Sequence, residues 1–282
     1  GIQSELGRSR ELLFASSAQP PATYTANTAF EAALGRKATW AEFAQAHPEH
    51  ITQQGTSVFD PVLCELVYLW FSAPGQLVLD PFAGGSVRGI VAAATGRRYA
   101  GVDLRAEQVD ANRAQWATLA QPGMPAPHWV QGDALALRQA LPDVQADFLF
   151  SCPPYGNLER YSDDKADLST MRYPEFLRTY RQIIKEAVAM LRQDRFACFV
   201  VGDIRDTQGL YRGFVSDTIA AFRDAGARLY NEAILVTQSG SLPIRAGKAF
   251  EVSRKLGKTH QQVLVFVKGD PRRATAACGA VR

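Results

Sequence analysis

Short apolar runs separated by helical stretches recur along most of this chain, and this alternation constrains its fold more than any other feature. Seven runs have the length and composition of strands: 77–80, 99–103, 128–130, 147–151, 195–203, 228–237 and 262–268. Helical stretches lie near 86–95, 105–118, 134–140, 174–192 and 213–225. Strands that alternate with helices predict an α/β fold with a mostly parallel sheet and helices on both faces.

The last two predicted strands follow each other without a predicted helix between them. The connecting segment, 239–260, is rich in Gly, Ser, Arg and Lys and is interpreted as a long basic loop. We therefore expect the last strand to pair antiparallel. Upstream of the first strand, FDPVLCELVYLWF carries apolar residues at helical spacing, and Pro61 is well placed to begin a helix.

The length of 282 residues, with 46% hydrophobic residues, suffices for one large core. Residues 1–55 show weak periodicity and contain SSAQPPATYTANT, which favours loop. We predict that 1–55 is an N-terminal arm or the remnant of another module, that 56–270 is the main domain, and that 271–282 is a C-terminal tail.

Several classes of protein are disfavoured by composition. Four cysteines lack CxxC spacing and partner histidines, so neither a metal site nor a disulfide framework is expected. No apolar run approaches the roughly 18 residues of a membrane span, and no signal-peptide pattern is present. We expect a cytoplasmic protein with reduced thiols and no membrane partner.

Basic charge is concentrated near the C-terminus, although the formal net charge of the chain is only +3. Eight Lys and Arg residues but two acidic residues lie between Gly240 and Arg273. Phosphate contacts supply most sequence-independent affinity for DNA, so this segment is a candidate DNA-binding surface, with a solvated loop as the alternative. The candidate residues are Arg245, Lys248, Arg254, Lys255 and Lys258.

Acidic residues and glycines follow three successive predicted strands. Asp80 ends the first strand, and Gly84 and Gly85 then let the backbone approach a ligand at the start of a helix. Asp103 ends the second strand and Asp133 follows the third, where carboxylates can accept hydrogen bonds from a nucleoside. Each Asp alone could instead cap the helix that follows it. Three acids at one sheet edge favour a ligand site.

These motifs resemble those of a known family. DPFAGGSVRG, the strand ending at Asp103, GDA and CPPY occur in the order found in S-adenosylmethionine-dependent DNA methyltransferases of the amino-group type, which act on N4 of cytosine or N6 of adenine. FDPVLCELVYLWF and GKTHQQVLVFVKG are also similar to segments of that family, as in phage and prophage DNA methylases. The resemblance covers roughly 56–270 and implies a Rossmann-like class I methyltransferase fold with seven strands and an antiparallel last strand.

The resemblance implies S-adenosylmethionine as cofactor, double-stranded DNA as partner, and a bacterial or phage-infected cell as the setting. Asp103 would bind the ribose and Asp133 the adenine, and Asp80 with the backbone from Phe82 to Gly85 would hold the methionine moiety. The implied cofactor residues are Phe59, Asp60, Asp80, Phe82, Ala83, Gly84, Gly85, Asp103 and Asp133. The implied catalytic residues, which face a base flipped out of the duplex, are Cys152, Pro153, Pro154 and Tyr155.

Cys152 departs from the family pattern, which has Asp, Asn or Ser before Pro-Pro as an acceptor for the amine. A thiol is a poor acceptor. Ser151 is one position away and should point to the opposite face of the strand. A thiolate is a good nucleophile, however, and C5 methylation of cytosine needs attack at C6. Amino-group methylation, with cytosine favoured, and C5 methylation with Cys152 as nucleophile both stay open, and so does an inert buried Cys152.

Three further functions stay open. Related enzymes with an Asn-Pro-Pro-Tyr loop methylate RNA or a protein glutamine, and a degenerate cofactor fold could serve as a non-catalytic DNA-binding module.

Asp203 and Arg205, which follow the fifth predicted strand, could contact the base or a phosphate, or could be ordinary turn residues.

Overall fold

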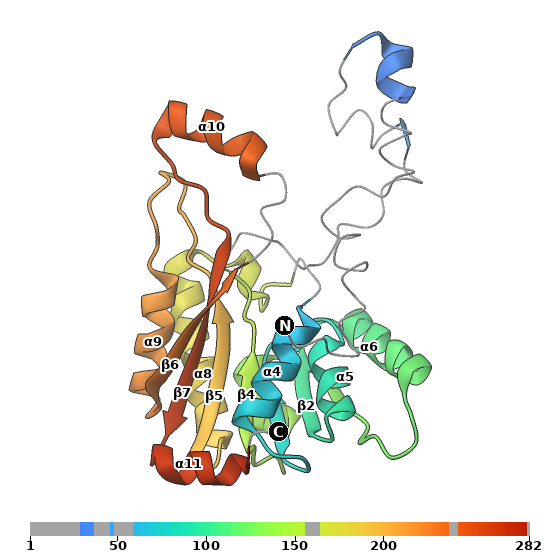
Figure 1. Cartoon of the computed structure of the whole chain (residues 1–282), viewed down its shortest axis with the longest axis vertical. Helices are drawn as coiled ribbons and strands as arrows, with labels where there is room; N and C mark the ends of the chain where they lie inside the picture. Colours follow the sequence, from blue (N-terminus) through green and yellow to red (C-terminus); the bar gives the residue numbers. More distant parts are fainter. Residues whose placement is uncertain (1–28, 37–45, 48–58, 156–163, 237–241, 281–282) are drawn as a thin grey trace. The chain divides into compact units, whose positions relative to one another are not determined.

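A computed structural model of the chain describes residues 29–36, 46–47, 59–155, 164–236 and 242–280 (Figure 1). They belong to two compact units, of which the larger comprises Leu63–Gln238 and Gly257–Arg282. The smaller unit comprises Gly1–Val62 and Ser239–Leu256. Most of the predicted arm, 1–55, lies outside the described residues.

The larger unit contains one sheet of seven strands in the order β3-β2-β1-β4-β5-β7-β6. The strands are β1 (Leu77–Asp80), β2 (Arg98–Asp103), β3 (His128–Gln131), β4 (Phe148–Ser151), β5 (Arg195–Val201), β6 (Arg228–Val236) and β7 (His260–Lys268). Strands β1 to β5 are parallel, whereas β7 lies between β5 and β6 and is antiparallel to both. The predicted mostly parallel sheet with an antiparallel last strand is confirmed.

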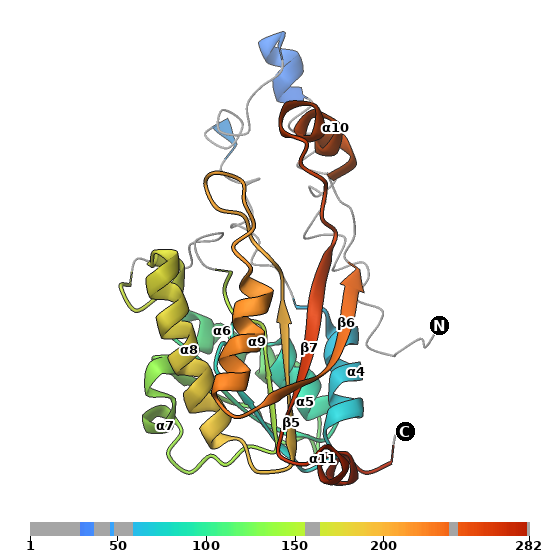
Figure 2. The same cartoon turned by 90° about the vertical axis from the view of Figure 1, so that its left-hand side faces the viewer.

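Apart from the last helix, which lies at one end of the sheet, the longer helices of the larger unit lie in two layers (Figures 1 and 2). They are α4 (Pro61–Phe71), α5 (Val87–Ala94), α6 (Ala106–Leu119), α7 (Leu137–Ala140), α8 (Tyr173–Met190), α9 (Phe214–Asp224) and α11 (Pro271–Cys278), with 3-10 turns at Ala134–Ala136 and Leu168–Thr170. Helices α8 and α9 cover one face of the sheet, and α4 and α5 the other. Pro61 begins α4, as predicted.

Strand alternation explains the two layers. Along β4, Leu149 belongs to the core cluster beneath α8 and α9, whereas Phe148 and Phe150 pack edge-on against Tyr68 of α4. Successive side chains of a strand point to opposite faces, so a strand buried on both sides reads as an unbroken apolar run. Full burial of one such side chain contributes about 2–3 kcal/mol, which ties the sheet to both helix layers.

Two predictions about the C-terminal third were wrong or incomplete. The segment expected to be a long loop, 239–260, contains a helix, α10 (Leu242–Ser253). Its Pro lies at the second helical position, where proline costs no hydrogen bond, and one Gly in the interior did not prevent the helix. The predicted tail, 271–282, includes α11, which is capped by Asp270 and buries Ala274.

Candidate functional site

The carboxyl ends of β1, β2, β4 and β5 meet at one edge of the sheet. The pairing places Asp80 opposite Gly101 of β2 and Ser151 opposite Phe199 of β5. The glycine loop and the CPPY segment, which were predicted to form one site, therefore follow neighbouring strands. Ligands of open α/β sheets bind at this edge.

Asp80 is buried completely, and its carboxylate is engaged by groups of the protein itself. Oδ2 accepts hydrogen bonds from Nε of Arg88 at 2.6 Å and from the hydroxyl of Tyr99 at 2.7 Å. Oδ1 accepts from the hydroxyl of Ser151 at 2.5 Å and from the amide of Phe82 at 3.2 Å. Four donors fill the acceptor sites of one carboxylate, so Asp80 organises the site from beneath.

Arg88 supports the glycine loop and was not predicted from the sequence. It lies in the first turns of α5, is 4% exposed, and pairs with Asp80. Its Nη2 also donates to the carbonyls of Phe82 at 2.6 Å and Ala83 at 3.0 Å. Burial alone would lower the pKa of Arg88, but the charges of Asp80, Tyr99 and Cys152 and the hydrogen bond to Asp80 together outweigh burial, and the pKa is raised. A lone Arg inside the apolar segment VRGIVAAA was the available signal.

The glycine loop is fixed on its other side by β2 and α6. The amide of Ala83 donates to Val102 O at 2.9 Å, and the amide of Gly84 donates to Oδ2 of Asp103 at 2.9 Å. The carbonyl of Gly84 accepts from Nδ2 of Asn112 at 2.7 Å. Gly84 has φ +48°, a left-handed conformation that favours glycine. At Gly85, which is exposed, an added Cβ would meet no protein atom within 4 Å.

Asp103 lies at the end of β2 with 13% of its side chain exposed. Burial raises its pKa, although hydrogen bonds from the amides of Arg105 and Gly84 and the charge of Arg105 act in the opposite direction. Asp133 follows β3, and its Oδ1 accepts from the amide of Leu135 at 2.8 Å. Asp133 therefore caps the 3-10 turn that follows it, as one of the two interpretations held. The cap uses Oδ1, so Oδ2 could accept a hydrogen bond from a ligand.

Two of the predicted cofactor residues, Phe59 and Asp60, precede α4. Oδ1 of Asp60 accepts from the amide of Val62 at 2.8 Å, which stabilises the start of the helix. Further along α4, the hydroxyl of Tyr68 donates to the carbonyl of Arg88 at 2.8 Å. Helix α4 therefore supports the base of the glycine loop through a residue that was not predicted.

The CPPY segment continues from β4, and its cysteine differs from the core cysteines. Cys64 and Cys198 are fully buried, and burial raises the pKa of both thiols. Cys152 is partly exposed, and its Sγ lies 3.6 Å from the hydroxyl of Tyr155. The expectation that Ser151 does not replace the missing acceptor agrees with the structure, because its hydroxyl is buried and donates to Asp80.

Tyr155 is anchored to the last strands of the sheet. Its hydroxyl accepts from Nε2 of Gln261 on β7 at 2.5 Å and lies 3.5 Å from the carbonyl of Val200 on β5. Its ring packs edge-on against Phe214, with centroids 6.2 Å apart. The loop after CPPY, 156–163, lies outside the described residues.

The predicted DNA-binding residues do not all belong to one unit. Arg245 and Lys248 lie on α10, and Arg254 and Lys255 follow it, all in the smaller unit. Lys258 belongs to the larger unit, where its Nζ lies 3.5 Å from the carbonyl of Asp203.

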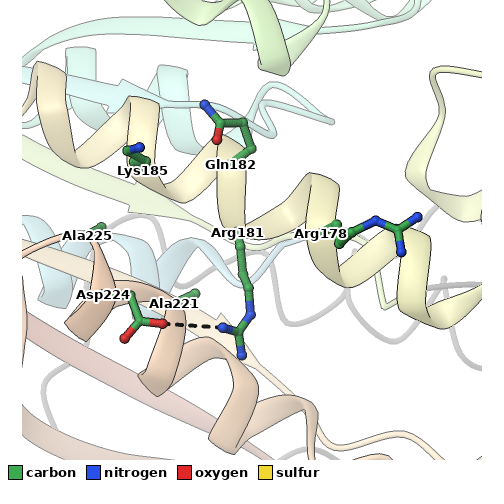
Figure 3. Close-up of a pocket in the computed structure, with 7 residues that line it drawn as sticks. All are labelled: Arg178, Arg181, Gln182, Lys185, Ala221, Asp224 and Ala225. Atoms are coloured by element: carbon green, nitrogen blue, oxygen red, sulfur yellow. Dashed lines mark hydrogen bonds and ion pairs between the residues drawn. The ribbon is translucent and has the colours of Figure 1, made fainter.

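A small pocket of about 170 Å³ lies between α8 and α9 (Figure 3). Its lining residues are Arg178, Arg181, Gln182, Lys185, Ala221, Asp224 and Ala225. None of the predicted site residues contributes to it, and Arg181 is paired with Asp224 at 3.3 Å. Across the described ranges, His, Cys, Asp and Glu form no cluster of three or more that could hold a metal ion. Every helix in these ranges is too short or too polar to cross a membrane.

The fold is that of a methyltransferase. The chain superposes on a Bacillus halodurans protein described as a methyltransferase with a TM-score of 0.50 and 12% identity, covering 75% of this chain and 99% of that one. TrmN from Thermus thermophilus gives a TM-score of 0.49 and 18% identity over 74% of this chain, which spans about half (49%) of TrmN. The sheet topology and the likeness to the Bacillus halodurans structure confirm the predicted Rossmann-like methyltransferase fold.

A sequence relative adds a shorter match. Over 47 residues, the chain is 43% identical to the DNA adenine methyltransferase YhdJ of Escherichia coli strain K12. The match spans 17% of this chain and 16% of the length of YhdJ. No protein-family model matches the chain.

Proposed function

We propose that this chain is an S-adenosylmethionine-dependent DNA methyltransferase that modifies the exocyclic amine of a base flipped out of the duplex, with N4 of cytosine favoured. The observation that carries the proposal is the adjacency of the glycine loop after β1 and the CPPY segment after β4. The two strands are neighbours, and the Ser151–Asp80 hydrogen bond joins their ends. A cofactor loop and a base-binding segment side by side are what methyl transfer to a base requires.

The residues of the loop fit the cofactor. Gly85 faces open space, so its backbone can approach a ligand, and Asp103 keeps part of its carboxylate exposed to accept from ribose hydroxyls. Asp133 would contact the adenine. Asp80 and Arg88 would hold the loop rather than the ligand, because their polar groups already bind each other and the loop carbonyls. When bound, the cofactor supplies an electrophilic methyl group.

The base side of the proposed site is formed by the CPPY segment. Backbone carbonyls near Pro153 and Pro154 would accept from the exocyclic amine, which draws its lone pair out of conjugation with the ring. Tyr155 would contact the flipped base while Gln261 and Phe214 hold its hydroxyl and ring. The short match to a DNA adenine methyltransferase supports N6 of adenine as the alternative amine.

A second chemistry is supported by the partial exposure of Cys152. A thiolate there would add to C6 of cytosine and leave again when the proton at C5 is lost after that carbon has been methylated. Among the described residues, no comparable contact or exposed group favours a protein-glutamine or an RNA substrate.

The experiment that tests the proposal follows a labelled methyl group. The protein is incubated with labelled S-adenosylmethionine and with duplex DNA, RNA or a protein extract in separate reactions. We expect label in DNA alone. Such a substrate would agree with a setting in the cytoplasm of a bacterial or phage-infected cell. Label in RNA or protein but not in DNA would contradict the proposed function, and cofactor binding without any transfer would favour the non-catalytic reading.

A further inference from the structure

The segment that joins β5 to α9 is a tight hairpin. Arg205 and Tyr211 pair across it, and the amide of Arg212 donates to the carbonyl of Ile204 at 2.9 Å. The amide of Asp206 donates to the carbonyl of Leu210 at 2.8 Å. These bonds flank Arg205 and Tyr211 and hold their backbone, so the two side chains are pre-organised for binding.

An aromatic ring and a cation of this hairpin lie close to a second cation, which comes from the segment before β7. Tyr211 is 47% exposed, and the guanidinium carbon of Arg205 lies 3.9 Å from the centroid of its ring. Nζ of Lys258, from the segment before β7, lies 5.7 Å from the same centroid. One N–H of Arg205 donates to the carbonyl of Gly209 at 2.7 Å. The guanidinium has five N–H donors, so the bond to Gly209 orients the group without exhausting it.

The acidic residues of the hairpin serve the backbone. Oδ1 of Asp203 accepts from the amides of Ile204, Gly213 and Phe214, at 2.9 to 3.1 Å. Oδ1 of Asp206 accepts from the amides of Gln208 and Leu210, at 2.9 to 3.0 Å. These carboxylates shape the turn and the start of α9, and neither forms an ion pair with Arg205 or Lys258 in the described structure.

The hairpin is connected to the CPPY segment through one residue. Phe214, whose amide is held by Asp203, packs against the ring of Tyr155. Lys258 lies three residues before Gln261, which donates to the hydroxyl of Tyr155. The exposed cluster therefore belongs to the same sheet edge as the proposed base-binding segment.

We propose that Arg205, Tyr211 and Lys258 form a contact surface for the DNA strand that flanks the target base. This inference rests on the proposed function. Arg205 and Lys258 supply cations for phosphates, and Tyr211 supplies an exposed ring on which a sugar or an unpaired base can pack. The combination of a stacking ring with cations suits a nucleic-acid strand, which carries bases and phosphates at a regular spacing.

The test measures binding of the full chain to a fluorescent duplex across a series of KCl concentrations. Lys258→Gln should weaken binding and reduce the slope of log K against log salt by about one. Tyr211→Ala should weaken binding about tenfold, and Tyr211→Phe should restore most of it. The matched controls are Lys185→Gln, an exposed lysine on α8 (Figure 3), and Tyr230→Ala, whose residue on β6 is 45% exposed.

The outcomes separate this proposal from the one on which it rests. Wild-type slope and affinity in both Lys258→Gln and Tyr211→Ala, with label still transferred to DNA, would overturn the contact surface alone. Transfer of label to RNA or protein instead of DNA would overturn the proposed function. If the wild type methylates DNA but Lys185→Gln weakens DNA binding as much as Lys258→Gln does, the effect is one of overall charge. That result would also contradict the specific surface.

Discussion

The hydroxyl of Ser151 donates a 2.5 Å hydrogen bond to Oδ1 of Asp80, which joins the carboxyl ends of β4 and β1 inside the protein. The same carboxylate pairs with Arg88, which binds two carbonyls of the glycine loop. The segment proposed to face the base and the loop proposed to face the cofactor are thus held by one buried network. Buried networks of this kind fix geometry when every member is satisfied.

Loss of the Asp80 charge should destabilise the fold. Asp80→Asn leaves the buried guanidinium of Arg88 without its counter-charge, and breaking a buried pair costs about 3–5 kcal/mol. Urea unfolding followed by circular dichroism measures the effect. The control is Asp110→Asn, which removes an exposed pair with Arg113 and should change the free energy of unfolding by less than about 0.5 kcal/mol. Equal effects of the two substitutions would contradict the network.

A side chain at Gly85 should block the cofactor without harming the fold. An added Cβ there meets no protein atom, so Gly85→Val should unfold at nearly the wild-type temperature. The same side chain would occupy the space in which we place the ligand, and we expect the Kd for S-adenosylmethionine to rise at least about tenfold, or about 1.4 kcal/mol. Calorimetry measures the Kd. Unchanged affinity would remove the loop from the proposed cofactor site.

The raised pKa of Asp103 predicts a pH-dependent effect on stability. A carboxyl with a higher pKa in the folded state stabilises the fold below its unfolded pKa, and that contribution is lost as the pH rises through the folded pKa. Its ordinary value is 3.8. The free energy of unfolding of Asp103→Asn relative to wild type should therefore increase as the pH rises from about 3 to about 6. Urea titrations at these pH values measure it; a decrease would contradict the assigned shift.

Gln261 should affect turnover through Tyr155. Gln261→Ala removes the donor to the hydroxyl of Tyr155, which frees the ring that we place against the base. We expect kcat to fall about tenfold, since small misplacements of a positioning group are costly, with little change in the Kd for S-adenosylmethionine. Gln262→Ala, on the opposite side of β7, is the control. A loss of activity in the control but not in Gln261→Ala would rule out this positioning role.

Cys152 separates the two chemistries. If the amine is the target, Cys152→Ala should keep turnover within about tenfold of wild type, and Cys152→Asn, which restores an acceptor, should equal or exceed it. If C5 is the target, Cys152→Ala should abolish turnover, because the thiolate addition cannot occur. Initial rates with labelled cofactor measure both variants. Trapping of the wild type on 5-fluorocytosine DNA would support the C5 route.

Most elements of the larger unit, α11 excepted, could be predicted closely because they are local features. Several strands are apolar runs that end at a charged or polar residue, as at Asp80 and Asp103, and helices such as α8 carry apolar residues at helical spacing. Helix α10 could not be predicted, because its Gly and Pro favour loop when the segment is read alone. The internal role of Asp80 was also beyond reach, since it depends on Ser151, Tyr99 and Arg88 converging from three other elements.

The site itself was only partly predictable for a similar reason. The strand-end acids could be named from spacing, but whether a carboxylate faces a ligand or the protein depends on donors distant in the sequence. Gln261 lies 106 residues from Tyr155, and no local pattern marks it as a partner. Long-range pairing of strands creates such contacts, and periodicity does not report it.

The chemical identity of the methylated nucleoside tests the central claim most directly. Duplex DNA treated with the protein and labelled S-adenosylmethionine is digested to nucleosides, which are separated by chromatography and identified by mass. We predict N4-methylcytosine, with N6-methyladenine as the amine alternative. Label in 5-methylcytosine would contradict amino-group transfer and assign Cys152 as the nucleophile, and the absence of any methylated nucleoside would contradict the account as a whole.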